Sequence, residues 1–236
     1  MTSVPLNLRQ VQGRITGACT AALRNVDSVT LLAVSKTFGA DAVREAFDAG
    51  QRQFGENYVQ EALDKIAALA DLRPQLVWHL IGPLQSNKTR PVAEAFDWVQ
   101  SVDRLKIAQR LSEQRPAGLT PLQVCLQVNI SGEASKSGLL PNQVLVVAQT
   151  VAALPRLRLR GLMAVPEPAT DVAAQRAPHR ALRELLAALN AAGLQLDTLS
   201  MGMSADLEAA VAEGATLLRV GTAIFGGRGA AAVLPD

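Results

Sequence analysis

Aromatic residues are scarce in this sequence: Phe, Trp and Tyr account for 3% of its 236 residues, whereas hydrophobic residues account for 49%. The core must therefore be built mainly from Leu, Val, Ala and Ile. Branched aliphatic side chains of this kind fill the interior of α/β barrels in layers. A chain of this length is in the range of one large domain and can bury a substantial core.

Cysteine and histidine are also rare, with two residues of each. Cys19 lies in a helical pattern and Cys125 in a strand-like run, so the two do not suggest a disulfide framework. His79 and His179 lie far apart in the sequence and no Cys cluster accompanies them. This pattern argues against a His/Cys metal site.

The sequence has neither a run of like charges nor a long apolar stretch. Lys and Arg total 23 against 21 Asp and Glu, and the scattered basic residues give no electrostatic footprint for nucleic acid or an anionic membrane. No segment reaches the roughly 18 apolar residues of a transmembrane helix, and the N-terminus lacks the apolar core of a signal peptide. We therefore expect a cytoplasmic protein that binds neither nucleic acid nor membrane.

Strand-like and helical patterns alternate along the chain. An amphipathic helix covers about residues 6–24, where apolar residues recur at spacings of three and four. Strand candidates follow, each succeeded by a helix or a helical turn, at 30–37, 53–57, 76–82, 98–102, 122–130, 159–165, 198–202 and 216–220. Such alternation predicts a parallel sheet, and eight units close a (β/α)8 TIM barrel. The alternative is an open doubly wound sheet, which is weakened because no Gly-x-Gly-x-x-Gly motif follows the first strand.

The predicted domain organisation is a single TIM-barrel domain over residues 1–228. This range includes the extra N-terminal helix at about residues 6–24. Residues 229–236 are small and apolar without a pattern. We expect them to form a poorly ordered tail.

One lysine stands out by its position. Lys36 ends the apolar run 30–37, and a lysine does not belong in a buried strand unless its amine is solvated, paired or used. Parallel sheets bind ligands at the carboxyl ends of their strands, so Lys36 is the candidate reactive amine. The other lysines fall on predicted outer helix faces or on loops, where solvated charge is the ordinary explanation: Lys65, Lys88, Lys106 and Lys136.

The loops after the last two strands, 200–204 and 219–226, combine glycines with hydroxyl groups. TIM barrels often bind a phosphate at this place, although two ordinary glycine turns are the alternative. Arg219 and Gly221 lie two residues apart on a strand and share a face, so Arg219 points into the same cavity unless it pairs with a carboxylate across the barrel. A lysine with a depressed pKa beside a phosphate site points to a phosphorylated aldehyde as its partner.

Two further polar side chains have open assignments. His79 lies within the third strand beside Trp78, where it can be either a core histidine or a catalytic base. Tyr58, the only tyrosine, can reach the barrel mouth or pack on the following helix.

Several segments of the sequence closely resemble the pyridoxal phosphate homeostasis protein family, in order and at matching spacing from about residue 30 to 228. They are 33–37, 54–61, 78–88, 128–130, 161–166, 200–208 and 219–226. The resemblance implies an alanine-racemase-like barrel that binds pyridoxal 5'-phosphate (PLP) as a Schiff base. A small departure is Gly39, where members of the family commonly have proline.

The resemblance also implies a role for each residue of the cofactor site. Lys36 forms the Schiff base and Arg219 faces the pyridine nitrogen. The phosphate is held by the Ser200 and Gly202 region together with Gly221 and Thr222. The residues expected to line the cofactor are Asn57, Met163 and Met201.

Two classes of function remain, an enzyme and a carrier. Racemisation in the related fold needs a second acid/base group, a tyrosine from a C-terminal β domain that we do not expect here, and Tyr58 is the only substitute. A guanidinium at Arg219 keeps the pyridine nitrogen unprotonated and makes the ring a weak electron sink. We therefore expect a protein that stores, buffers or delivers PLP, with apo PLP-dependent enzymes as recipients. A weak PLP-dependent racemase is the alternative, and a cofactor-free aldolase-like enzyme ranks last.

Overall fold

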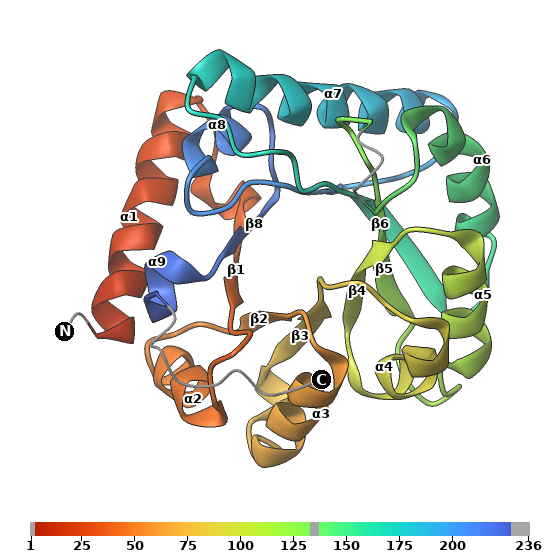
Figure 1. Cartoon of the computed structure of the whole chain (residues 1–236), viewed down its shortest axis with the longest axis horizontal. Coiled ribbons are helices and arrows are strands. Elements are labelled where there is room, and N and C mark those ends of the chain that lie inside the picture. The colour runs from red at the N-terminus through yellow and green to blue at the C-terminus, as the bar shows by residue number, and fades with distance from the viewer. Residues whose placement is uncertain (1–2, 133–136, 228–236) are drawn as a thin grey trace.

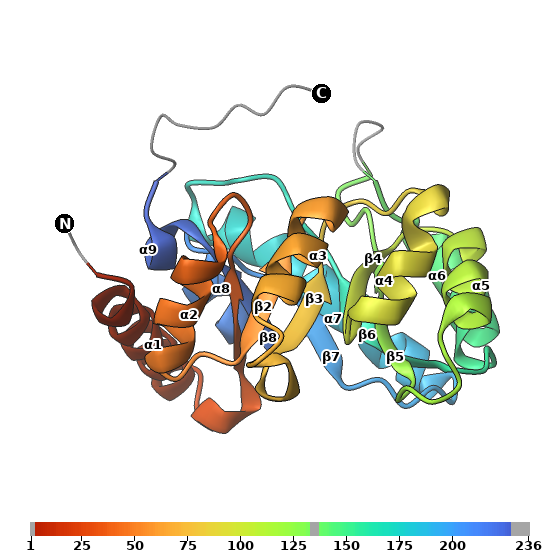
Figure 2. The ribbon, with the colours of Figure 1, turned by 90° about the horizontal axis from the view of Figure 1, so that it is seen from below.

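Parallel strands close into a barrel, and every strand pairs with its neighbours in the sequence while the last pairs with the first (Figures 1 and 2). The computed structural model describes residues 3–132 and 137–227. In these two ranges the strands are β1 (Thr30–Val34), β2 (Gln53–Glu56), β3 (Val77–Leu80), β4 (Trp98–Val102), β5 (Leu122–Gln127), β6 (Leu157–Met163), β7 (Thr198–Ser200) and β8 (Leu217–Val220). The predicted TIM barrel is confirmed, and the open doubly wound sheet is wrong.

Helices surround the barrel (Figure 1). They are α1 (Val4–Ala21), α2 (Ala40–Asp48), α3 (Val59–Ala68), α4 (Thr89–Ala95), α5 (Leu105–Gln114), α6 (Pro141–Ala152), α7 (Val172–Ala191), α8 (Leu207–Ala212) and α9 (Thr222–Phe225). Short 3-10 turns at Val26–Ser28, Arg73–Gln75 and Ser86–Lys88 join some of the elements. Within the described ranges, every helix is too short or too polar to traverse a lipid bilayer.

The core is largely aliphatic, as the composition predicts. Fully buried branched residues such as Leu32, Val99 and Leu162 come from strands around the barrel. The few aromatic residues nevertheless supply the largest buried side chains, Phe54, Trp78 and Phe96. Phe54 and Trp78 lie in register on neighbouring strands, with ring centroids 5.8 Å apart.

Helix α1 is the predicted N-terminal helix, and it lies on the flank of the barrel beside α2, α8 and α9 (Figure 1). Its buried stripe includes Leu8, Val11 and Ile15, and Asn7 Nδ2 donates to the carbonyl oxygen of Ile224 at 2.8 Å. The helix ends at Ala21 rather than near residue 24, because Leu23 has a left-handed φ of 55° that a helix cannot continue through.

Several strands end earlier than the apolar runs predict. Strand β1 ends at Val34 instead of residue 37, and β5 ends at Gln127 instead of residue 130. The runs continue beyond the strands because the residues that follow remain enclosed at the barrel mouth; Ser35 and Val128, for example, are buried. The predicted tail at 229–236 lies outside the described residues.

Candidate functional site

The predicted site residues gather along one arc of the barrel mouth. They lie at or just beyond the carboxyl ends of β6, β7, β8, β1 and β2, which are consecutive strands of the closed barrel. The residues on this arc are Met163, Ser200, Met201, Gly202, Arg219, Gly221, Thr222, Lys36 and Asn57. The fold therefore brings together side chains that are up to 186 residues apart in the sequence (222 − 36).

Lys36 lies in a tight turn, two residues past the end of β1. The turn is closed by the Phe38 N–H, which donates to the carbonyl oxygen of Ser35 at 3.1 Å. Lys36 is half-buried, and its Nζ makes no hydrogen bond or ion pair with any residue that the structure describes. Its amine therefore lies at the mouth without a competing partner from residues 3–132 or 137–227.

Lys65 is not on an outer helix face, and the expectation of a solvated charge is wrong. Its side chain is 6% exposed and lies between α3 and the end of β1. The ammonium donates to the Ser35 carbonyl oxygen at 2.7 Å, to Glu56 Oε1 at 2.8 Å and to Glu61 Oε1 at 2.6 Å. Three N–H groups thus meet three acceptors, which satisfies the ammonium completely.

The two carboxylates that pair with Lys65 also hold the turn that contains Lys36. Glu56 Oε1 accepts the Ser35 hydroxyl at 2.5 Å, and Glu61 Oε1 accepts the Thr37 N–H at 2.6 Å. Thr37 has a left-handed φ of 68°, a costly conformation for a β-branched residue. Burial raises the pKa of Glu56, an effect that Lys65 and the Ser35 hydroxyl oppose.

Arg219 is buried inside the barrel and reaches β7 and the residue after β6 instead of a carboxylate. Its Nη1 donates to the Ser200 hydroxyl at 2.6 Å and its Nη2 donates to the Ala164 carbonyl oxygen at 2.8 Å. Burial lowers the pKa of Arg219 to about 10, against the charge of Asp206, so the guanidinium stays protonated at neutral pH. The predicted alternative of a direct carboxylate partner is not found among the described residues.

The Ser200 hydroxyl continues this contact into the barrel core. It donates to Gln100 Oε1 at 2.6 Å, and Gln100 Nε2 lies 2.9 Å from His79 Nδ1. His79 Nε2 in turn lies 3.1 Å from Gln53 Oε1. Both ring nitrogens of His79 are therefore engaged, and burial lowers its pKa to about 3. His79 is therefore a neutral core histidine, which is one of the two predicted alternatives.

Glycines shape the two loops that were predicted to hold a phosphate. Gly202 has a φ of 89°, and a Cβ added there would lie 2.4 Å from the Cβ of Ala210. A Cβ at Gly221 would lie 3.1 Å from the Val34 carbonyl oxygen. Gly221 precedes α9 and Thr222 is its first residue, and the first N–H groups of a helix lack intrahelical acceptors. Only glycine allows both loops to lie this close to the barrel.

Asp206 braces the loop after β7. Its Oδ1 accepts the Met203 N–H at 2.6 Å, and its Oδ2 lies 2.9 Å from His179 Nε2. Burial raises the pKa of Asp206, but hydrogen bonds from His179 and Met203 outweigh it and leave the pKa below its usual value. No sequence pattern connects these residues, because His179 lies within α7, far along the chain from the loop after β7.

The remaining predicted lining residues differ in exposure. Met163 and Met201 are fully enclosed, at 1% and 0% exposed. Asn57 is half-buried, and its Oδ1 is shielded from solvent without a hydrogen-bond partner in the described chain. Tyr58 is 57% exposed and precedes the first residue of α3, and its two predicted places, the barrel mouth and the following helix, stay open.

The remaining residues singled out in the sequence are three lysines and Gly39. Lys88 and Lys106 are exposed, as expected, and Lys136 lies outside the described residues. Gly39 is the residue before α2 and has an unstrained φ of −74°. The resemblance implies that this departure from proline loosens the turn after Lys36 but leaves the named site residues untouched, and this expectation stays a prediction.

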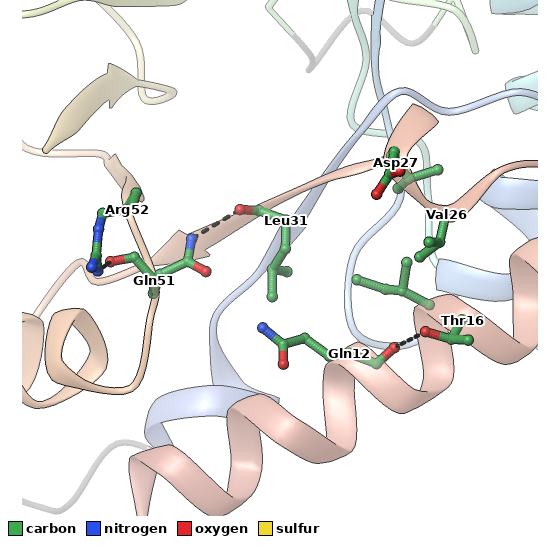
Figure 3. Close-up of a pocket in the computed structure, with 9 residues that line it drawn as sticks. Gln12, Thr16, Val26, Asp27, Leu31, Gln51 and Arg52 are labelled. Atoms are coloured by element: carbon green, nitrogen blue, oxygen red, sulfur yellow. Dashed lines mark hydrogen bonds between the residues drawn. The ribbon is translucent and has the colours of Figure 1, made fainter. Parts of the chain in front are cut away.

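A cavity of about 510 Å³ lies elsewhere, beside α1 and the start of β1 (Figure 3). Gln51 at its wall donates to the Leu31 carbonyl oxygen at 2.9 Å. The cavity is lined by Gln12, Ile15, Thr16, Val26, Asp27, Val29, Leu31, Gln51 and Arg52. Since none of the predicted site residues contributes to it, it is separate from the arc that carries Lys36.

Comparison with known proteins supports the resemblance seen in the sequence. Residues 11–229 match the family model of the alanine racemase N-terminal domain. The pyridoxal phosphate homeostasis protein of Pseudomonas aeruginosa is 64% identical over 228 residues, which cover 97% of each chain. The Escherichia coli protein of the same name is 54% identical over 229 residues, covering 97% of this chain and 98% of that protein. The structure of PipY from Synechococcus elongatus with PLP bound has a TM-score of 0.79 at 41% identity, covering 90% of this chain and 100% of that chain.

Proposed function

This chain belongs to the pyridoxal phosphate homeostasis protein family, and on that premise we propose that it binds PLP and acts in intracellular PLP homeostasis. It stores, buffers or delivers the cofactor through a reversible covalent bond at Lys36. The observation that carries this proposal is an unpartnered lysine amine on the same strand-end arc as a buried, protonated arginine and two close-packed glycine loops. We place this activity in the cytoplasm.

The residues present fit PLP. The cofactor has an aldehyde, a pyridine nitrogen and a phosphate, and the arc has an amine, a guanidinium and loops with backbone N–H groups to match them. The buried Asn57 Oδ1 without a partner is an acceptor that a bound molecule can satisfy. When bound, PLP supplies an aldehyde that condenses with a primary amine and releases water, a reaction that hydrolysis reverses.

Each residue of the arc has an assigned task. Lys36 provides the amine. Arg219 stays charged and would offer an N–H group to the pyridine nitrogen, which would keep that nitrogen an unprotonated acceptor. The Gly202 turn, Gly221 and Thr222 would hold the phosphate, because backbone N–H groups can bind an anion without a basic side chain. Ser200 contributes by holding Arg219, while Met163, Met201 and Asn57 enclose the ring.

Absorption titration with PLP tests the proposal. Wild-type protein should develop a visible absorption band that saturates at one PLP per chain. Borohydride should abolish this band, because it reduces the Schiff base and leaves the cofactor permanently attached. Lys36→Ala should lose the band, whereas Lys88→Ala, which removes an exposed lysine outside the arc, should keep it. A wild-type protein without a band at saturating PLP contradicts the proposal.

Delivery to apo PLP-dependent enzymes is tested by mixing the loaded protein with such an enzyme in the presence of a competitor that traps free PLP. Recovery of enzyme activity despite the trap supports direct delivery. Activity that disappears with the trap indicates that the protein only buffers free PLP. Exchange of the α-proton of an amino acid, faster than with free PLP and lost in Lys36→Ala, would instead identify the racemase-like alternative.

A further inference from the structure

The turn that carries Lys36 is held from both sides by a buried cluster on α3 and β2. The cluster consists of Lys65, Glu56 and Glu61, which are 6%, 0% and 30% exposed. Before Lys36, it binds the Ser35 carbonyl oxygen through Lys65 and the Ser35 hydroxyl through Glu56. After Lys36, it accepts the Thr37 N–H through Glu61. The two residues that flank Lys36 are thus both fixed, while the Lys36 side chain bonds to no residue of the described ranges.

We propose that Lys65 is a positioning residue for Lys36. Its ammonium joins Glu56 to Glu61 and thereby ties the end of β1, the end of β2 and the first turns of α3 into one unit. This unit holds Thr37 in its left-handed conformation and aims the Lys36 amine into the site. The inference rests on the proposed function, because it assigns the role of aiming to the lysine that bonds to PLP.

Stability alone is a poor explanation for this cluster. A buried ion pair is a weak source of stability, since apolar residues of similar volume often do as well or better. Hydrogen bonds from charged groups are directional, however, and fix geometry better than apolar contacts do. Thr37 shows where that geometry is used, because its positive φ is unfavourable for a β-branched residue and needs an external constraint.

The cluster is also separate from the groups that touch the rest of the predicted cofactor. Arg219 donates to Ser200, and Gly202 and Gly221 lie beside Ala210 and Val34. Lys65 bonds instead to Ser35, Glu56 and Glu61. Loss of Lys65 should therefore weaken the bond at Lys36 selectively and leave binding of the ring and the phosphate nearly unchanged.

The experiment compares PLP with pyridoxine 5'-phosphate, an analogue that lacks the aldehyde. In Lys65→Met, the apparent affinity measured by the visible band should fall on the order of tenfold or more, because a charge-assisted constraint is lost. Affinity for pyridoxine 5'-phosphate, measured by calorimetry, should change less than about twofold. The matched control is Lys106→Met on the exposed side of α5, which should behave as wild type with both ligands.

A second readout needs no cofactor. Hydrogen exchange of the Thr37 amide, followed by NMR in PLP-free protein, should accelerate on the order of tenfold in Lys65→Met and not in Lys106→Met. If Lys65→Met does not fold, Glu61→Ala carries both tests, because Glu61 is the direct acceptor of the Thr37 N–H and is partly exposed. Glu61→Gln retains an acceptor and should recover most of the wild-type behaviour.

The outcomes separate the two proposals. Unchanged PLP affinity and unchanged Thr37 exchange in Lys65→Met and Glu61→Ala overturn the positioning role, and so does an equal loss of affinity for both ligands, which marks a general structural defect. A wild-type protein that binds neither ligand overturns the proposed function, whereas the Thr37 exchange rate still tests whether the cluster constrains the turn.

Discussion

Arg219 Nη1 donates to the Ser200 hydroxyl at 2.6 Å, and that hydroxyl donates onward to Gln100. A hydroxyl that accepts from a guanidinium is a stronger donor, because hydrogen bonds in a chain polarise one another. The next link requires Gln100 Nε2 to donate to His79 Nδ1, so the proton of the neutral imidazole must lie on Nε2, where it faces Gln53. The charge of one site residue thus fixes the orientation of polar groups across the barrel core.

Replacing Ser200 by Ala should disconnect this chain. The variant leaves Gln100 Oε1 and one Arg219 N–H without their partner in a buried place, which costs about 1–3 kcal/mol of stability. Urea unfolding followed by circular dichroism measures this loss. Thr150→Ala is the control, because its hydroxyl lies on the exposed surface of α6 and binds only within its own helix. Equal stability of Ser200→Ala and wild type would contradict the prediction.

His79 should make the protein less stable as the pH falls below about 6.5. Burial lowers its pKa from 6.5 to about 3, so between these values the unfolded chain binds a proton that the folded chain does not. The free energy of unfolding then decreases as the pH decreases, with a slope that approaches about 1.4 kcal/mol per pH unit. Above pH 6.5 both states are neutral at this position and the effect is absent.

The measurement is urea unfolding of wild type and His79→Gln at several pH values between 4 and 8. The glutamine variant should lose this part of the pH dependence, although it is less stable overall. In the native wild type, the His79 imidazole signals should not titrate between pH 5 and 8 by NMR. A midpoint near 6.5 for those signals would show that the ring is not buried in its neutral form.

The sequence was sufficient to predict the barrel and to place the candidate site residues at the carboxyl ends of neighbouring strands. Regular alternation of apolar strands and amphipathic helices leaves few topologies, and the carboxyl ends of adjacent strands must then meet. Lys36 and Arg219 are recognisable because charged side chains are rare in buried strands. Gly221 is recognisable because it follows the last strand, where TIM barrels often bind a phosphate. Side-chain pairs across the barrel, such as Ser200 with Gln100, depend on rotations that no periodicity records.

Lys65 shows what the helical pattern missed. Val59, Leu63 and Ile66 recur at helical spacing in α3, yet they are only partly buried. The fully enclosed positions are instead Ala62, Lys65 and Leu69. A spacing of three and four places Lys65 between two apolar residues on one face, so the signal was present, but a charged residue on an apolar stripe is normally assigned to the surface.

The two cysteines should be unreactive in the folded protein. Cys19 is 1% exposed and Cys125 is 0% exposed, and burial raises the pKa of Cys125 to about 12. Both thiols are therefore inaccessible, and the thiolate of Cys125, which is the reactive form, is nearly absent at pH 8. A colourimetric thiol reagent should detect close to none of the two thiols in native protein and both of them in urea. Rapid reaction of one thiol without denaturant would mean that its surroundings open easily.

Gly202→Ala should destabilise the protein, whereas a glycine-to-alanine change at an unstrained position should not. Gly202 has a φ of 89°, and its added Cβ would lie 2.4 Å from that of Ala210, so strain and overlap together should destabilise the protein by about 2–4 kcal/mol. Gly17→Ala is the matched control, because Gly17 lies within α1 with nothing within 4 Å of its added Cβ. That variant should stabilise the protein by about 0.5–1 kcal/mol, since alanine is the better helix former.

Opposite changes in the free energy of unfolding of the two variants, measured by urea unfolding, support the close packing of the loop after β7. PLP affinity should fall only in Gly202→Ala, because only that loop belongs to the proposed phosphate site. A neutral effect of Gly202→Ala on both stability and affinity would show that the loop moves away at little cost and does not define the phosphate position.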